Sequence, residues 1–95
     1  MNTKIKNKHL DELFNELLKL ENIDECYNFF DDLCTISELH AMAQRYQVAK
    51  MLHEGQIYSN IVKETGASTA TISRVNKCLT YGSDGYKLAF ERSKK

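Results

Sequence analysis

The sequence contains no proline and no tryptophan, and only four glycines are spread over its 95 residues. Proline and glycine are the residues that most disfavour a helix interior, so their scarcity favours long helical segments. No stretch alternates apolar and polar residues for long enough to predict a strand. The chain is therefore predicted to be all-α, with about six helices.

Long apolar runs and paired cysteines are missing as well. No segment is apolar enough over a sufficient length to span a membrane, and the first residues lack the apolar core of a secretory signal. The three cysteines are odd in number and contain no Cys-x-x-Cys pair. We therefore expect free thiols in a reducing compartment, a cytoplasmic location and no membrane partner.

Signatures of catalysis and of metal binding are also lacking. His9, His40 and His53 are not spaced three or four residues apart, as two ligands on one helix face would be. The sequence has no Gly-x-Ser-x-Gly nucleophile motif and no glycine-rich phosphate loop. We predict neither an enzyme nor a metal site.

The charges sum to zero but are divided unevenly along the chain. Residues 1–44 carry 4 lysines and 9 acidic residues, a net charge of −5, whereas residues 45–95 carry 9 basic and 4 acidic residues, a net charge of +5. This polarity allows one part of the molecule to meet an anion while the other does not. The alternative is that helical surfaces simply carry charges.

The acidic half is rich in large apolar residues at helical spacing, over residues 9–20 and again over residues 23–34. Thr35 and Glu38 fit a capping box that begins a third helix, which should end near Gly55. The apolar face of this helix is predicted to consist of Leu39, Met42, Ala43, Tyr46, Ala49 and Leu52. After a loop at residues 81–83, Asp84 is predicted to cap a final helix.

These segments predict a single helical domain over residues 1–95. Residues 1–56 would form a dimerisation scaffold, residues 57–80 a helix-turn-helix, and residues 81–95 a C-terminal helix and tail. A second copy of the chain would bury the apolar faces of the short N-terminal helices, which are marginal alone. An ordinary monomeric core is the alternative.

Residues 58–77 have the pattern of a helix-turn-helix. Gly66 supplies the turn, where a positive φ is needed, and Ser68 is a good N-cap for the second helix. Ile61 and Val62 are predicted to be buried on the first helix, with Ala67 beside the turn. The buried side of the second helix is predicted to consist of Ile72 and Val75.

The outward positions of that second helix are then small, hydroxylated or basic, without an acidic residue: Thr69, Ala70, Ser73, Arg74 and Lys77. This composition is typical of a helix that lies in the major groove of double-stranded DNA, against phosphates and base edges. A purely structural helical hairpin is the alternative that this pattern leaves open.

Residues 33–80 resemble the tryptophan repressor family, and especially its short Trp-repressor-like relatives of the YerC/YecD type. The resemblance rests on the helix around Arg45, on Gly66-Ala67 and above all on the string Ala70-Thr71-Ile72-Ser73-Arg74. It implies an intertwined all-α homodimer and a transcriptional regulator, with repression as its action. It also implies that DNA is met by Ser59, Ser68, Thr69, Ala70, Ser73 and Thr80.

The family's tryptophan pocket is matched by Thr35, Arg45 and Arg74, which the resemblance implies as an effector pocket. Two positions depart from the tryptophan-binding members. Val75 stands where they have a glycine and would fill space that the indole needs, and Cys78 stands where they have a serine. These departures argue against tryptophan as a co-repressor, and no other cofactor is implied.

Two functions remain after the sequence alone. The first is a dimeric, sequence-specific DNA-binding regulator that uses the helix-turn-helix. The second is a helical protein–protein interaction module, in which the acidic and aromatic N-terminal half binds a partner through its apolar face and the hairpin is scaffold.

Overall fold

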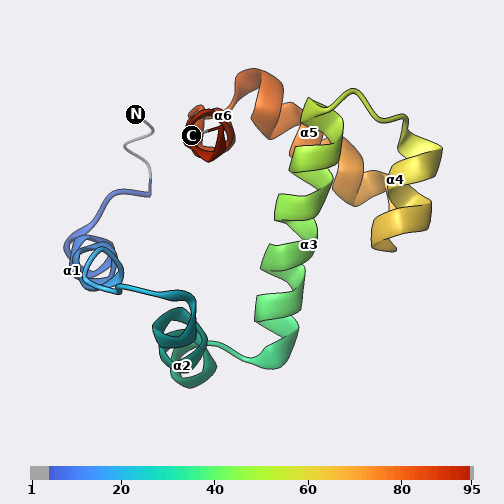
Figure 1. Cartoon of the computed structure of the whole chain (residues 1–95). Helices are drawn as coiled ribbons and strands as arrows, with labels where there is room; N and C mark the ends of the chain where they lie inside the picture. Colours follow the sequence, from blue (N-terminus) through green and yellow to red (C-terminus); the bar gives the residue numbers. More distant parts are fainter. Residues whose placement is uncertain (1–4, 95) are drawn as a thin grey trace. The chain divides into compact units, whose positions relative to one another are not determined.

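The computed structural model describes residues 5–94, which form six helices and no strand. The prediction of an all-α chain with about six helices is therefore confirmed. In chain order, the helices are α1 (Lys8–Leu17), α2 (Ile23–Leu33), α3 (Ile36–His53), α4 (Tyr58–Thr65), α5 (Thr69–Tyr81) and α6 (Gly85–Ser93) (Figure 1). Among these six, none has the length and apolarity needed to cross a membrane.

The chain groups into two compact units, which divide between Leu39 and His40 inside α3. The first unit contains α1, α2 and the first turn of α3, and the second contains the rest of α3 with α4, α5 and α6. The division falls within α3, whereas the sequence predicted the end of a scaffold after this helix.

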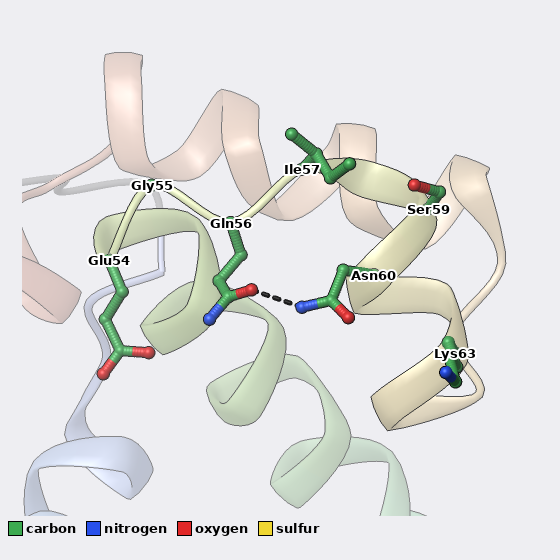
Figure 2. A pocket seen from close by; sticks show the side chains of 7 residues that line it. All are labelled: Glu54, Gly55, Gln56, Ile57, Ser59, Asn60 and Lys63. Atoms are coloured by element: carbon green, nitrogen blue, oxygen red, sulfur yellow. Dashed lines mark hydrogen bonds between the residues drawn. The ribbon is translucent and has the colours of Figure 1, made fainter.

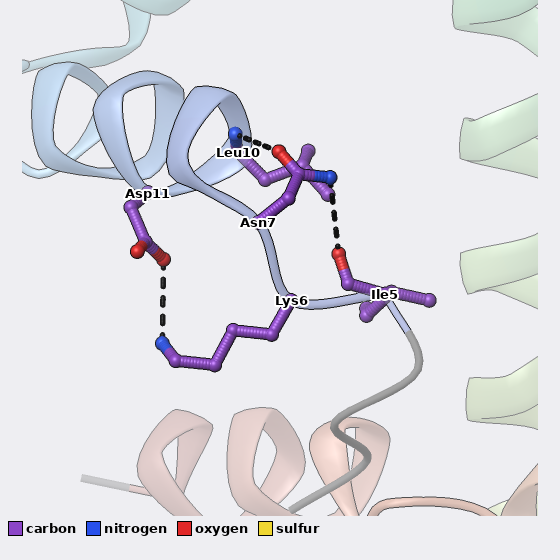
Figure 3. A network of polar contacts seen from close by, with 5 residues as sticks. All are labelled: Ile5, Lys6, Asn7, Leu10 and Asp11. Carbon is purple, nitrogen blue, oxygen red and sulfur yellow. Dashed lines mark hydrogen bonds and ion pairs between the residues drawn. The ribbon is translucent and has the colours of Figure 1, made fainter.

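The two helices of the N-terminal unit begin with the same device. The side chain of Asn7 accepts a hydrogen bond from the N–H of Leu10 at 2.9 Å, and Lys6 pairs with Asp11 at 3.3 Å (Figure 3). Asn22 caps α2 in the same way. Neither helix contains a buried residue, and Leu18, Ile23 and Tyr27 are 84%, 73% and 73% exposed.

The predicted capping box at the start of α3 is present. The Thr35 N–H donates to Glu38 Oε1 at 2.8 Å, and the Glu38 N–H donates to Thr35 Oγ1 at 3.1 Å. The pKa of Glu38 is lowered, chiefly by the backbone N–H of Thr35 and secondarily by the Thr35 side chain, because hydrogen bonds to the carboxylate favour its ionised form.

The apolar core lies in the C-terminal unit and draws on α3, α4, α5 and α6. Its buried residues are Val48, Ala49, Met51, Ile61, Ala67, Ile72, Val75 and Phe90.

This core confirms part of the predicted apolar face of α3, since Ala49 is buried and Leu52 packs against the core, and it corrects the rest. Val48, Ala49 and Met51 are its buried members, whereas Met42 and Tyr46 are 38% and 41% exposed. The reason is that α3 is apolar on more than one side, and the core of the C-terminal unit covers the side that carries Val48 and Met51.

Helix α6 is held by Phe90, whose ring stacks on His53 with a centroid distance of 4.8 Å and lies 5.7 Å from the Tyr46 ring. Asp84 precedes α6 at the N-cap position, as predicted, but its side chain does not cap the helix. Asp84 has a left-handed φ of 62° and its side chain makes no capping hydrogen bond, because an N-cap needs extended backbone. Its carboxylate pairs with Lys87 at 3.6 Å instead.

Candidate nucleic-acid interface

Helices α4 and α5 form the predicted helix-turn-helix, and the turn between them is fixed by its own hydrogen bonds. Gly66 ends α4 in the left-handed conformation, with φ 73° and ψ 4°, as predicted from its place in the sequence. Thr65 Oγ1 donates to the carbonyl of Ile61 at 2.7 Å and accepts from the N–H of Ala67 at 3.1 Å. The direction in which the chain leaves α4 is therefore set by local chemistry.

Ser68 caps α5, as the sequence predicted. Its Oγ accepts from the N–H of Thr71 at 3.1 Å. The first turn of α5 contains no acidic residue. This end of the helix carries the positive pole of the helix dipole, and no carboxylate of α5 neutralises it there.

The side of the α4–α5 helix-turn-helix, or hairpin, that faces the core is closed to solvent. Ile61 and Ile72 are 0% exposed, and Ala67 and Val75 are 2% exposed. Val62 is 36% exposed, so the prediction that it lies on the buried side of α4 is wrong. Val62 directly follows Ile61, and adjacent residues of a helix lie on different faces, so the face that buries Ile61 leaves Val62 exposed.

All eight residues predicted to meet DNA are exposed. They are Ser59 on α4 and Ser68, Thr69, Ala70, Ser73, Arg74, Lys77 and Thr80 at or on α5. Two of their hydroxyls are already used inside the chain, because Ser68 Oγ donates to Thr71 Oγ1 and Thr80 Oγ1 donates to the carbonyl of Asn76. These two can accept from a ligand but do not offer a free proton, whereas no side-chain hydrogen bond within residues 5–94 engages Thr69 or Ser73.

The sequence analysis did not identify Asn60 and Lys63 of α4 as candidate site residues. A shallow hollow beside the start of this helix is lined by Glu54, Gly55, Gln56, Ile57, Ser59, Asn60 and Lys63 (Figure 2). The side-chain amide of Asn60 donates to Gln56 Oε1 across the hollow. The available signal was spacing, because Lys63 is the one basic residue of α4 and stands four positions after Ser59 on the same helix face.

The cations of the hairpin are not neutralised by neighbours. Helices α4 and α5 carry Lys63, Arg74 and Lys77 against the single carboxylate of Glu64. The ion pairs found within residues 5–94 all lie outside these two helices. The positive charge of the hairpin is therefore available to an external anion.

The residues of the predicted effector pocket are distributed over both units. Thr35 belongs to the N-terminal unit and its hydroxyl is engaged in the capping box. Arg45 is half-buried on α3 and Arg74 is exposed on α5. No hydrogen bond or ion pair in the described part of the chain joins these arginines. Val75 is buried in the core, whereas Cys78 is exposed.

No cluster of histidine, cysteine, aspartate or glutamate side chains that could hold a metal ion occurs among residues 5–94.

Comparison with known proteins agrees with this geometry. Residues 8–94 match the family described as Trp repressor protein. The uncharacterized protein YerC of Bacillus subtilis is 58% identical over 91 residues, which are 96% of this chain and 88% of that protein. A crystal structure of a candidate Trp repressor from Staphylococcus aureus has a TM-score of 0.93 at 50% identity and covers 99% of this chain and 95% of its own.

A TrpR-like protein from Eubacterium eligens also has a TM-score of 0.93, at 52% identity, and the match covers 98% of this chain and 96% of that chain. Both structures are similar over nearly the whole length, and the sequence match of the family spans all six helices. The chain therefore belongs to the Trp repressor family.

Proposed function

We propose that this protein is a sequence-specific DNA-binding transcription regulator that represses by occupying its operator. The observation that carries the proposal is the outer face of α5, where Thr69, Ser73 and Lys77 are exposed and acidic residues are absent. The buried inner side of the hairpin and its hydrogen-bonded turn support a rigid element that can enter a groove. The family and the DNA-compatible charge of α4 and α5 support the same function.

In this mechanism α5 lies in the major groove and α4 crosses the phosphate backbone. Arg74 and Lys77 on α5 and Lys63 on α4 bind phosphates, which supplies affinity without sequence preference. Thr69, Ala70 and Ser73 are too short for bidentate contacts to bases. Sequence preference then comes from methyl contacts, bridging water and the shape of the duplex.

The functional unit is a homodimer. The apolar residues Leu18, Ile23 and Tyr27 of the N-terminal unit are 84%, 73% and 73% exposed in the single chain. Burial of apolar surface contributes about 25 cal/mol for each Å², so a second copy that covers these faces stabilises both helices. A dimer also presents two reading helices to successive major grooves, about 34–36 Å apart, on a roughly palindromic site.

Sedimentation equilibrium tests the dimer. The wild-type protein is expected to have twice the monomer mass at micromolar concentration, and the double variant Ile23→Asn, Tyr27→Ser is expected to dissociate. Asp24→Ser, on the polar side of α2, is the matched control and should remain dimeric. A monomeric wild-type protein would contradict this part of the proposal.

Tryptophan does not act as co-repressor. Val75 fills its place in the core at 2% exposure, and Cys78 offers only a weak hydrogen-bonding group. The chain contains no tryptophan, so the fluorescence of added tryptophan can be followed without a protein background. A titration should show no saturable change; saturable binding would contradict the role given to Val75.

The regulator acts in the cytoplasm and does not catalyse a reaction. Its three cysteines are unpaired in the structure, which suits a reducing compartment. Its exposed cations and hydroxyls form a binding surface rather than an acid–base pair.

Electrophoretic mobility of a random duplex at low salt is the first test of DNA binding. A shift at micromolar protein is expected, and selection from a random DNA pool should then yield a palindromic sequence. The exposed apolar residues of α1 and α2 also favour a second candidate, a helical protein–protein interaction module. Absence of a shift with any duplex would favour that module over the regulator.

A further inference from the structure

One side chain of α3 is bonded to the end of α4. The amide nitrogen Nε2 of Gln44 donates to the carbonyl oxygen of Thr65 at 3.1 Å, and both groups are partly buried. The two residues are 21 positions apart. The other hydrogen bonds made by side chains within residues 5–94 join positions no more than five apart, so this bond is the polar link between helices in that part of the chain.

The acceptor carbonyl lies at the point where the chain leaves α4 and turns toward α5. Thr65 is the last residue of α4, and a carbonyl at a helix end has no partner within its own helix. The side chain of the same residue is bonded to Ile61 and to Ala67. Ala67 immediately precedes Ser68, the N-cap of α5. A hydrogen bond that fixes the position of Thr65 therefore also restricts the position of the first turn of α5.

The apolar contacts beside this bond do not fix orientation to the same degree. Val48, one turn after Gln44 on α3, is 0% exposed in the core, as are Ile61 and Ile72. Apolar burial depends on area and is not directional, so α5 could rotate or slide by a small amount with little loss of buried apolar area. A hydrogen bond requires both a distance and an angle, and it fixes the register.

We propose that Gln44 is a positioning residue for the DNA-reading helix. Its hydrogen bond to Thr65 sets the orientation of α4 and α5 against the second half of α3. The role of this orientation in operator choice rests on the proposed function. A small rotation of α5 moves Thr69 and Ser73 away from base edges, whereas the long side chains of Arg74 and Lys77 still reach phosphates.

The test compares three variants. Gln44→Met has a similar length but no donor, Gln44→Lys keeps a donor, and Gln47→Met makes the same exchange at an exposed position of α3. Each is assayed at a temperature where circular dichroism shows it folded. The readout is the ratio of affinities for the selected operator and for a scrambled duplex of equal length.

Gln44→Met is expected to reduce this ratio by about tenfold, the effect of losing one hydrogen bond, with little change for the scrambled duplex. Gln44→Lys should restore most of the ratio, and Gln47→Met should leave it at the wild-type value. A wild-type ratio in Gln44→Met, with or without a lower melting temperature, would overturn the proposal.

Residual dipolar couplings provide a second readout that does not involve DNA. In the wild-type protein, couplings from residues 40–53, α4 and α5 should fit one rigid body, and in Gln44→Met those of α4 and α5 should need a different orientation. An unchanged fit would overturn the positioning role. If the wild-type protein bound no DNA, the proposed function would fail, and the couplings would still decide the role of Gln44.

Discussion

Ser68 and Thr71 form a two-bond cap at the start of α5. Ser68 Oγ accepts from the Thr71 N–H at 3.1 Å and donates to Thr71 Oγ1, also at 3.1 Å. The residue that precedes α5 is thus both a helix cap and an exposed part of the candidate DNA surface. These two roles can be separated by substitution.

Ser68→Ala is expected to lower the free energy of unfolding by about 1 kcal/mol, the usual effect of removing a cap. Ser68→Asp should retain the cap and the stability, since aspartate is an equally good N-cap, but should weaken DNA binding because its charge repels phosphates. Urea denaturation and mobility shift measure the two effects. Equal DNA affinity of Ser68→Asp and wild type would exclude Ser68 from the interface.

Arg74→Ala and Lys77→Ala are each expected to weaken binding to every duplex and to reduce the slope of log affinity against log salt by about 0.9. Thr69→Ala should instead change which operator is preferred, since a threonine methyl and hydroxyl contact base edges. Lys19→Ala, which removes one positive charge from the acidic half, is the control for net charge. An unchanged operator ranking in Thr69→Ala would contradict the role of that residue.

Gly66→Ala is expected to destabilise the protein by about 1–2 kcal/mol, because φ is 73° and an L side chain is strained there. An added Cβ at Gly66 would meet nothing within 4 Å, so the effect arises from the backbone alone. Gly85→Ala is the matched control, since its Cβ would also meet open space and its φ is not positive. Thermal denaturation should show a loss only at Gly66; equal melting temperatures would contradict the strain argument.

Glu38 should make stability depend on pH in the acid range. Its pKa is lowered from the ordinary value of 4.5 by the bonds from Thr35, so the folded state favours the ionised form. The stabilisation is fully present above pH 4.5 and is lost as pH falls through the lowered pKa. Urea unfolding of Glu38→Gln should therefore differ most from wild type near neutral pH and least in acid. A difference that does not change with pH would show that the charge of Glu38 has no part in the cap.

Much of the fold could be predicted because its signals are local. The Thr35–Glu38 capping box, the turn at Gly66 and the cap at Ser68 each depend on residues within about one helical turn. The spacing of Ile72 and Val75 likewise defines the buried side of α5 without reference to the rest of the chain. The outer face of α5 could then be predicted from the positions left over once the buried positions were assigned.

The candidate site was predicted less completely on α4. The spacing of Lys63 from Ser59 was an available signal, but it indicates nothing about Asn60, so the tertiary structure was needed to place Lys63 and Asn60 beside one hollow.

The amino-acid sequence by itself determined the six helices, the caps at Thr35 and Ser68 and the acid-free side of α5, because these depend on spacing within a single helix. Only the tertiary structure decided that Val48 and Met51 rather than Met42 and Tyr46 are buried, and that Gln44 bonds to Thr65. The physical reason is that an apolar or amide side chain has several possible partners, and the choice depends on which helix is packed against it.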